Sequence, residues 1–447
     1  MATMGRRTFV VGSGTATATW LAQHARVRKA VAQTQSAARN EASRIVVAVI
    51  GTGGMGSGHV RALAARADVT VACLCDVDSQ RLATAAKAVE SASGKRPRQV
   101  SDLRKVLDDK SVDAVFIATP DHWHAPAAIL ALDAGKHVYV EKPCCHNIRE
   151  GRLMADAVTR SGKLLQVGTQ SRSTDVVREG IERLQKGEIG EVIVAKAWNS
   201  QRRGSIGKSQ PATPPAYLDF DQWVGPAPMV PYRPNLLPAV WRWWYDFGCG
   251  DMGNDGVHDI DVACWGLGVT GHPVTVTCAG SKYFFDDDQQ FPDTQYAVCE
   301  YSEVTGGGRR KQLIFEQRIW SPYTQEGYEN GAAFYGTNGL LLLGHTSGWK
   351  LYGPRNALIA ERSGPVDLPG HHTNFLDCIR GSQKQLNADI RAGMLSAGVV
   401  HLSNIAARLG RVLRFDPQRE QILDDEAANA LVRRQYRDGH WAVPRGV

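Results

Sequence analysis

Apolar and polar residues form long alternating blocks over the first third of the chain. Residues 45–50 are continuously apolar and rich in β-branched side chains, which is typical of a parallel strand buried on both faces. A helical pattern over 59–66 follows, and then a second apolar run over 69–75. This order predicts a doubly wound α/β domain built around a parallel sheet.

The same alternation continues as far as residue 143. Three more helices are expected over 79–93, over 102–109 and up to Ala134, with Ser101 as an N-cap and Gly135 as a stop signal. Strands are expected over 113–118 and 137–140. The loops at their carboxyl ends, 119–124 and 141–143, lie where such sheets bind ligands.

Shorter alternating runs in the second half predict a large, mostly antiparallel sheet. Its strands are expected at Val274–Cys278, Gln295–Tyr301, Gln312–Trp320 and Leu340–Leu343, with a turn at Gly306–Gly308 and helices at about 373–380 and 393–410. The chain is therefore divided into a leader at 1–40, a first α/β domain at 44–168, a second at 169–415 with the 373–410 helices packing back, and a surface-wrapping extension at 416–447.

Composition fits this two-domain picture. A chain of 447 residues is too long for one core, and its 43% hydrophobic and 22% charged residues are ordinary for a soluble protein. No apolar run is long enough to cross a bilayer, so no membrane insertion of the mature chain is expected. The nine cysteines are odd in number and include no CxxC pair, so neither a disulfide framework nor a zinc site is predicted.

The net charge of +7 does not indicate a nucleic-acid partner. Residues 1–40 carry six Lys and Arg and no acidic residue, so the remaining chain is nearly neutral. In that leader, Arg6-Arg7-Thr8-Phe9 precedes a mildly apolar stretch and resembles a twin-arginine export signal, with a candidate cleavage site at 30–32. A periplasmic or otherwise exported location is predicted; a cytoplasmic protein with a free tail is the alternative.

A glycine-rich turn directly follows the first strand. Gly51, Gly53 and Gly56 fit GxGxxG, with Gly54 and Met55 between them, and a helix follows. These glycines allow a tight turn, a close approach of the pyrophosphate to the backbone, and packing of the helix on the strand. The sequence therefore predicts a dinucleotide cofactor.

Asp76 ends the second strand, 25 positions after Gly51. A carboxylate there accepts hydrogen bonds from the adenosine ribose and repels a 2′-phosphate, which favours NAD over NADP. Thr119, Pro120 and His124 on the next loop are further candidates for cofactor contact.

The fifth strand ends in Glu141-Lys142-Pro143. Hydride transfer at an alcohol carbon needs a cation near the developing alkoxide, and Lys142 can supply it. Pro143 favours an extended backbone at Lys142, which helps to aim its side chain. Glu141 and Lys142 are both candidates for cofactor binding as well.

These motifs together resemble the glucose–fructose oxidoreductase / inositol dehydrogenase / MocA family. The resemblance rests on GxGxxG, the strand-end Asp, A-T-P-x-x-x-H and E-K-P, and extends over Gly168-Thr169-Gln170, residues 253–261 and residues 372–379. It implies a Rossmann domain, an α/β domain whose open sheet mediates homo-oligomerisation, a small carbohydrate substrate, and a cofactor contact from Gln170.

His258 is the candidate general base, because its unperturbed pKa lies near operating pH. On a helix over 257–267, Asp261 would share the face of His258 and could orient the imidazole or contact substrate. The alternative is that Asp261 is solvated or caps the core. Inositol-dehydrogenase-like members carry an aspartate four positions before the histidine. Here that position is Asn254 and the acid is Asp255, so both are assigned to the catalytic site with His258 as the base.

His122 and His124 form an HxH pattern, but no third ligand stands at a suitable spacing, so no metal is predicted. Trp123 is expected to border the substrate pocket. The long connection at 200–245 contains Trp243 and Tyr245, whose rings could pack on sugar faces or simply hold the loop in place. It also contains Arg242, which could hydrogen bond to substrate hydroxyl groups.

The sequence thus predicts an NAD-dependent oxidoreductase acting on a sugar, polyol or glycoside. Export would leave little free NAD for recycling, which favours a tightly held NAD that is reduced and reoxidised in one cycle. Sugar–sugar hydride exchange and redox-neutral glycoside cleavage both fit such a cycle. The alternatives are a plain dehydrogenase and a non-catalytic NAD-binding sensor.

Overall fold

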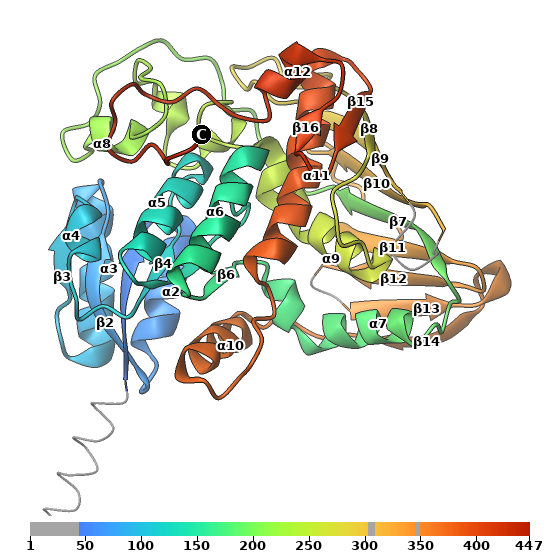
Figure 1. The fold of residues 1–447 in the computed structure, drawn as a ribbon, viewed down its shortest axis with the longest axis horizontal. Helices are drawn as coiled ribbons and strands as arrows, with labels where there is room; N and C mark the ends of the chain where they lie inside the picture. Colours follow the sequence, from blue (N-terminus) through green and yellow to red (C-terminus); the bar gives the residue numbers. More distant parts are fainter. Residues whose placement is uncertain (1–43, 303–308, 346–347) are drawn as a thin grey trace, which may run out of the picture.

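The computed structural model describes residues 44–302, 309–345 and 348–447. The leader at 1–40 and the expected turn at 306–308 lie outside these residues. Two α/β units stand side by side, with the parallel sheet in one and the large mixed sheet in the other (Figure 1).

The first unit is a six-stranded parallel sheet in the order β3-β2-β1-β4-β5-β6. Its strands are β1 Ile45–Ile50, β2 Val69–Cys75, β3 Arg98–Val100, β4 Ala114–Ile117, β5 His137–Val140 and β6 Leu165–Val167. Its helices are α2 Gly54–Ala64, α3 Ser79–Ser93, α4 Arg104–Leu107, α5 Asp121–Asp133 and α6 Ile148–Ser161. The strand order reverses between β1 and β4, where doubly wound sheets bind ligands. The predicted fold of this domain is confirmed.

The second unit is a ten-stranded sheet in the order β14-β13-β12-β11-β7-β10-β9-β8-β15-β16. Its strands are β7 Val192–Asn199, β8 Thr275–Ser281, β9 Thr294–Tyr301, β10 Lys311–Arg318, β11 Asn330–Gly336, β12 Leu340–Gly344, β13 Gly348–Tyr352, β14 Leu358–Arg362, β15 Leu413–Asp416 and β16 Gln421–Ile422. Only β7 and β10 pair in parallel, so the prediction of a large, mostly antiparallel sheet is confirmed.

Helices cover one face of this sheet. They are α7 Asp175–Gln185, α9 Val257–Leu267 and α11 Ile390–Leu409, and the remaining helices are α8 Phe220–Val224, α10 Leu368–Arg380 and α12 Glu426–Ala430. Both helices of the 373–410 region contact the first domain. Phe375 of α10 contacts Phe116 in the first core, and α11 packs against α6, α9 and β8.

The predicted helix ends differ from the structure where side chains cap the backbone. α10 and α11 begin earlier than expected, because the carboxylates of Asp367 and Asp389 accept hydrogen bonds from Gly370 N and Ala392 N. Ser101 was predicted to cap the helix expected over 102–109, and this is wrong. α4 is a short helix that starts at Arg104, whose backbone N–H donates to Asp102 at 2.9 Å.

The chain after α12 returns to the first domain. Residues 436–447, here termed the C-terminal strap, run past α8 and over α5 and α6 (Figure 1). Arg437 N donates to Pro226 O, and the Trp441 ring lies 5.9 Å from the Trp123 ring. Within the described residues, no helix is both long and apolar enough to cross a membrane.

Candidate active site

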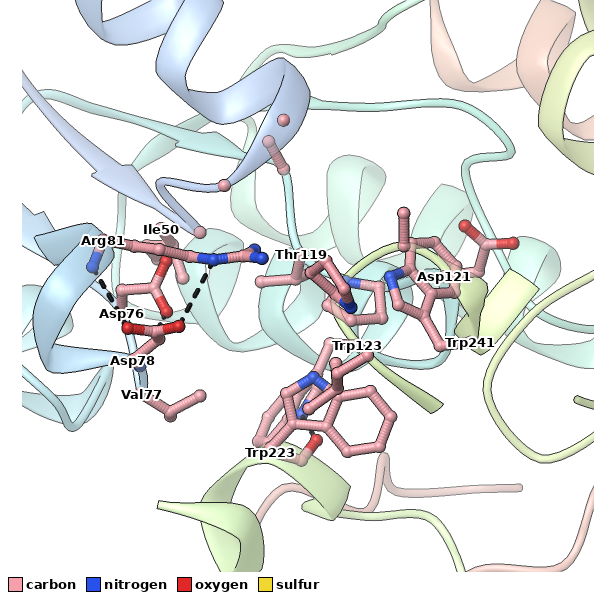
Figure 2. A pocket seen from close by; sticks show the side chains of 18 of the residues that line it. Ile50, Asp76, Val77, Asp78, Arg81, Thr119, Asp121, Trp123, Trp223 and Trp241 are labelled. Atoms are coloured by element: carbon pink, nitrogen blue, oxygen red, sulfur yellow. Dashed lines mark hydrogen bonds and ion pairs between the residues drawn. The ribbon is translucent and has the colours of Figure 1, made fainter. Parts of the chain in front are cut away.

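A cavity of about 760 Å³ opens at the carboxyl ends of the parallel strands. The loops after β1, β2, β4 and β5 form one wall, and residues 215–242 together with the start of α9 form the other. Figure 2 shows acidic residues and Arg81 at one end and aromatic rings at the other. The site therefore lies between the two domains.

The glycine loop has the shape that a pyrophosphate requires. Gly51 has a φ of 85°, and an added Cβ would lie 2.6 Å from Ala118 O. A Cβ at Gly56 would lie 1.9 Å from Gly51 O, so α2 could not pack against the turn with any other residue. Gly53, Gly54 and Met55 line the cavity, as predicted. These residues fit a dinucleotide.

Asp76 lies at the end of β2 and lines the same cavity. Its carboxylate accepts hydrogen bonds from Thr52 N at 2.6 Å and Thr52 Oγ1 at 2.9 Å, which fixes its orientation. Arg81 on α3 was not predicted. Its guanidinium pairs with Asp78 at 3.3 Å and extends over Gly53 toward Thr119 (Figure 2), where it can contact a phosphate. The strand-end acid and this cation together fit the adenosine half of NAD.

The loop after β4 is tied to the loop after β5 through His124. Its Nδ1 lies 2.7 Å from Pro143 O and its Nε2 lies 2.9 Å from Thr119 O. Thr119, Pro120 and His124 all line the cavity, and Thr119 Oγ1 is buried without a partner among the described residues. That free hydroxyl group is available to a cofactor.

A buried hydrogen-bond chain holds Glu141. His59 Nε2 lies 3.0 Å from Glu141 Oε1, and His59 Nδ1 lies 2.9 Å from His372 Nε2. Gln170 donates to Glu141 Oε1 at 2.9 Å. Burial alone would raise the pKa of Glu141, but the hydrogen bond and charge of His59, together with Lys142, lower it. Glu141 and Gln170 both line the cavity, where the sequence places cofactor contacts.

Lys142 extends from this loop toward the second domain, and its Nζ donates to Asn254 O. Asn254 also accepts from Arg242 Nε at 2.6 Å and donates to Asp251 at 2.9 Å. It lies on the π-helical segment Met252–Gly256 that precedes α9. Lys142, Asn254 and Arg242 line one cavity, so three residues predicted from separate motifs meet at one place.

His258 lies at the start of α9 and also lines the cavity. Burial holds the pKa of His258 well below its usual value, and the positive charge of Lys142 adds to this effect. Its Nδ1 has no partner among the described residues. The imidazole is therefore neutral and free to accept a proton.

The predicted pairing of His258 with Asp261 is wrong. Asp261 accepts from Arg172 Nε at 2.6 Å and Arg172 Nη2 at 3.0 Å, and it does not line the cavity. The His258 ring instead packs against the His345 ring, with 5.0 Å between the ring centroids. His345 Nδ1 lies 3.1 Å from the carboxylate of Asp259. Two residues three positions apart on a helix can fail to contact each other, as here, where Arg172 binds Asp261.

Three other predicted site residues lie away from the cavity. Asp255 pairs with Arg203 at 3.0 Å, so its carboxylate is already engaged. Trp243 is buried, and Tyr245 donates its hydroxyl to Gln290 O at 2.7 Å. Neither ring lines the active-site cavity, so their expected sugar contacts are not supported by the structure.

Asp121 is a cavity residue that the sequence did not single out. It begins α5, is 4% exposed, and lies near the positive charges of Lys142 and Arg242. Burial raises the pKa of Asp121 against the lowering effect of those charges. Its position between Pro120 and the HxH pattern was the available signal, but a first-turn aspartate usually serves only the helix dipole.

Aromatic residues form the outer wall. Trp123 donates its indole N–H to Trp223 O at 3.0 Å, and both rings line the cavity with Trp241 (Figure 2). Trp223 and Trp241 also belong to a small core with Leu236 and Phe247. Aromatic rings of the 200–245 connection therefore fix the loop, and some of them also face the cavity; their packing on a sugar stays a prediction.

The HxH pattern serves packing and loop positioning. His122 Nε2 lies 3.1 Å from Trp223 O, and burial lowers the pKa of His122 to about 3. Within residues 44–302, 309–345 and 348–447, no group of three or more His, Cys, Asp or Glu side chains is arranged to hold a metal ion.

Comparison with known proteins identifies the family. Residues 45–169 match the NAD-binding Rossmann domain of the Gfo/Idh/MocA oxidoreductase family, and residues 191–306 and 349–443 match its C-terminal α/β domain. The chain belongs to this family. The predicted fold and the predicted oxidoreductase class are confirmed.

Several curated relatives of the chain are named as polyol dehydrogenases or as glycosyl hydrolases. Inositol 2-dehydrogenase 2 of Saccharopolyspora erythraea is 30% identical over 57% of this chain and 62% of its own length. The NAD⁺-dependent scyllo-inositol 2-dehydrogenase of Bacillus subtilis is 24% identical over 71% of this chain and 82% of its own. A glycosyl hydrolase family 109 protein of Shewanella pealeana is 33% identical over 26% of each chain. The names are those of two polyol dehydrogenases and a glycosyl hydrolase, and the chain spans only part of each relative's length.

A solved structure shows the same architecture. Levoglucosan dehydrogenase in complex with NADH and levoglucosan matches 83% of this chain and 99% of its own, with a TM-score of 0.63 and 19% identity. At that identity the likeness concerns the fold.

Proposed function

We propose that this protein transfers a hydride between NAD and a CH–OH group of a sugar, polyol or glycoside. The observation that carries the proposal is the convergence of Lys142 and His258 on the cavity that holds the glycine cradle and Asp76. Bound NAD supplies the hydride acceptor and donor. A cation and a neutral base in one cavity supply the remaining chemical needs of the reaction.

The chain's own residues divide this work. His258 takes the hydroxyl proton as the substrate is oxidised and returns it during reduction, because it lines the cavity as a neutral imidazole whose Nδ1 has no partner among the described residues. Lys142 donates a hydrogen bond to the reacting oxygen and stabilises its developing negative charge. Asn254, Arg242 and Asp121 are placed to bind the other hydroxyl groups.

We further propose that NAD stays bound between turnovers. The β2–α3 loop is joined to the 200–245 connection, because Ser79 N donates to Tyr217 O at 3.0 Å and Asp219 N donates to Val77 O at 3.0 Å. His440 and Trp441 of the C-terminal strap line the same cavity. Both segments cover the cofactor side, so release of NAD would require their displacement.

Retention suits an exported enzyme, which the twin-arginine-like leader suggests. With a resident cofactor, each turnover must return the hydride to a second sugar or to the same molecule. In the first case, one sugar is oxidised and another is reduced. The substrate class follows from the curated relatives and the hydroxyl-binding groups around Lys142.

The second case is redox-neutral glycoside cleavage, favoured by the similarity to a glycosyl hydrolase family 109 protein. Oxidation of a ring hydroxyl to a ketone acidifies the neighbouring C–H. A base removes that proton, and the electron pair expels the glycosidic oxygen as the C–O bond breaks. Water then adds across the resulting double bond, and the ketone is reduced again.

One experiment separates these cycles. The protein is purified from its folded, exported form, any copurified cofactor is identified, and it is assayed without added NAD on a p-nitrophenyl glycoside and on a mixture of two free sugars. Retained NAD with aglycone release supports cleavage, and paired oxidation and reduction supports exchange. NADH accumulating in solution in proportion to product would show a plain dehydrogenase, and no turnover with Lys142 intact would favour a sensor.

We also propose that the protein is a homo-oligomer through the uncovered face of the ten-stranded sheet. Tyr296 and Tyr335 expose 44% and 39% of their surface on this face, while helices cover the other. Light scattering should give a dimer or tetramer mass, and Tyr296→Lys with Tyr335→Lys should reduce it to that of one chain. A monomeric parent protein would contradict the proposal.

A further inference from the structure

A second cavity of about 450 Å³ shares no lining residue with the active site. Its walls are the N-terminal end of α6, the loop over 245–249, the C-terminal half of α11, and residues 430–435 after α12. Hydride transfer as described above uses none of these walls, so the cavity needs its own explanation.

The lining of this second cavity is cationic. Arg408, Arg433 and Arg434 contribute to it, against one carboxylate, that of Asp246. The Arg434 side chain is only 8% exposed and is paired with Glu150 at 2.8 Å. Its Nη1 is buried and has no partner among the described residues. A buried guanidinium with a free N–H group is costly unless something accepts from it.

Two more buried donors lie in the same wall. His146 contacts a backbone group of Gly248, and Asn147 contacts the Tyr436 side chain. Neither contact has the geometry of a hydrogen bond, so the ring nitrogens of His146 and Asn147 Nδ2 have no full partner among the described residues. Burial holds the pKa of His146 well below its usual value, with the charge of Arg434 acting in the same direction, so the ring offers one N–H. Among its buried side-chain atoms without a full partner, the cavity lining holds more hydrogen-bond donors than acceptors. A ligand rich in acceptor oxygens would satisfy those donors.

We propose that this cavity binds a small oxyanion, the carboxylate or phosphate group of a sugar acid or sugar phosphate. Arg434, His146 and Asn147 donate to the anion, and Arg408 and Arg433 attract it at the exposed side. The Tyr245 ring, which Arg408 covers at 4.2 Å, and the Phe291 ring provide an apolar wall for the carbon skeleton. This places Tyr245 at a ligand site other than the one predicted.

The test is calorimetric titration of the full chain in excess NAD, which keeps the pyrophosphate cradle filled. The probes are inorganic phosphate, glucose 6-phosphate and glucuronate. Saturable binding is expected, and Arg408→Gln combined with Arg433→Gln should weaken it at least tenfold. Both side chains are exposed, so the double variant should fold. Arg391→Gln, an exposed site at the other end of α11, is the matched control and should bind like the parent.

The probes also separate the sources of the anion. Tighter binding of glucose 6-phosphate or glucuronate than of phosphate assigns a sugar-linked ligand, and equal binding assigns the free ion; either supports the proposal. His146→Phe, which fills the wall with an apolar ring, should abolish binding. No saturable binding of any probe, or equal affinity in the double variant and the control, overturns it.

Discussion

Lys142 points toward the second domain, so we expect its side chain to act on the substrate more than on the cofactor. Its Nζ reaches Asn254 O across the domain boundary, whereas the glycine cradle lies on a different loop, the one after β1. Lys142→Met should therefore lower kcat by about 10²–10⁴, the range expected for loss of a charge-stabilising donor, with little change in NAD affinity. Steady-state kinetics and NAD titration check this.

The control for Lys142 is Lys87→Met on α3, where the side chain is exposed. It should leave kcat unchanged. If Lys142→Met turned over at the parent rate, the proposed alkoxide-stabilising role would be wrong and the sensor hypothesis would gain support.

Replacing Asp121 should lower activity without lowering stability. Burial raises the pKa of this carboxyl group, so its ionised form costs the folded state stability above its unfolded pKa. Asp121→Asn should leave the free energy of unfolding at pH 7 unchanged or higher. It should also raise KM or lower kcat about ten- to a hundredfold, as loss of a charged hydrogen bond at a substrate predicts.

Urea unfolding and steady-state kinetics measure both quantities for Asp121→Asn. Asp133→Asn, at the exposed end of the same helix, controls for the loss of a carboxylate and should preserve activity. A variant that lost stability and activity together would assign Asp121 to folding.

The residues that sequence could place were those whose backbone position determines their role. Gly51, Asp76 and Lys142 sit at strand ends, and the parallel sheet brings strand ends together whatever the side chains do. Asp261 was misplaced because its direction depends on Arg172, which lies far away in sequence. Side-chain partners across domains have no local signal.

At the scale of elements, the buried central strands were predictable and several strands of the second sheet were not. β1 and β4 are apolar throughout, whereas β11 reads NGAAFYG and shows no regular alternation. Its small residues are needed for packing: a Cβ at Gly331 would lie 2.8 Å from Leu343 O. Tertiary contact, which a linear pattern cannot show, decides such a strand.

The C-terminal strap is the element that we expect to control cofactor exchange. Arg104 lies 4.6 Å above the Trp441 ring, and Arg437 pairs with Asp221 at 2.8 Å, so the strap is fastened to both domains. Trp441→Ala should raise the dissociation rate of NAD at least tenfold, about 1.4 kcal/mol, with kcat unchanged under saturating NAD. Tyr323→Ala, which alters another exposed ring, is the control.

Stopped-flow displacement of NAD by an excess of unlabelled cofactor would measure the dissociation rate. A parent protein that releases NAD within one turnover would contradict retention by the strap, and so would a Trp441→Ala variant with the parent's dissociation rate.

For the whole molecule, buried histidines make stability depend on pH in a predictable direction. Burial lowers the pKa of His371 and His401 to about 4 and that of His122 to about 3. The unfolded chain therefore binds more protons than the folded chain below about pH 6.5. The stabilisation from each neutral histidine is complete above that pH and decreases as pH falls toward the folded-state value.

Buried carboxyl groups act in the opposite direction, which is why a difference measurement is needed. Burial raises the pKa of Asp121, Asp251 and Asp259, so the folded state binds extra protons there just above pH 3.8. His401→Gln removes one histidine from the balance. The free energy of unfolding of the parent minus that of His401→Gln should fall by about 1.4 kcal/mol per pH unit between pH 6 and pH 4.5. The control is Gln383→Asn, an exposed site without a titrating group, for which the same free-energy difference should stay constant across that range. A constant difference for His401→Gln would instead mean that His401 is protonated in the folded protein.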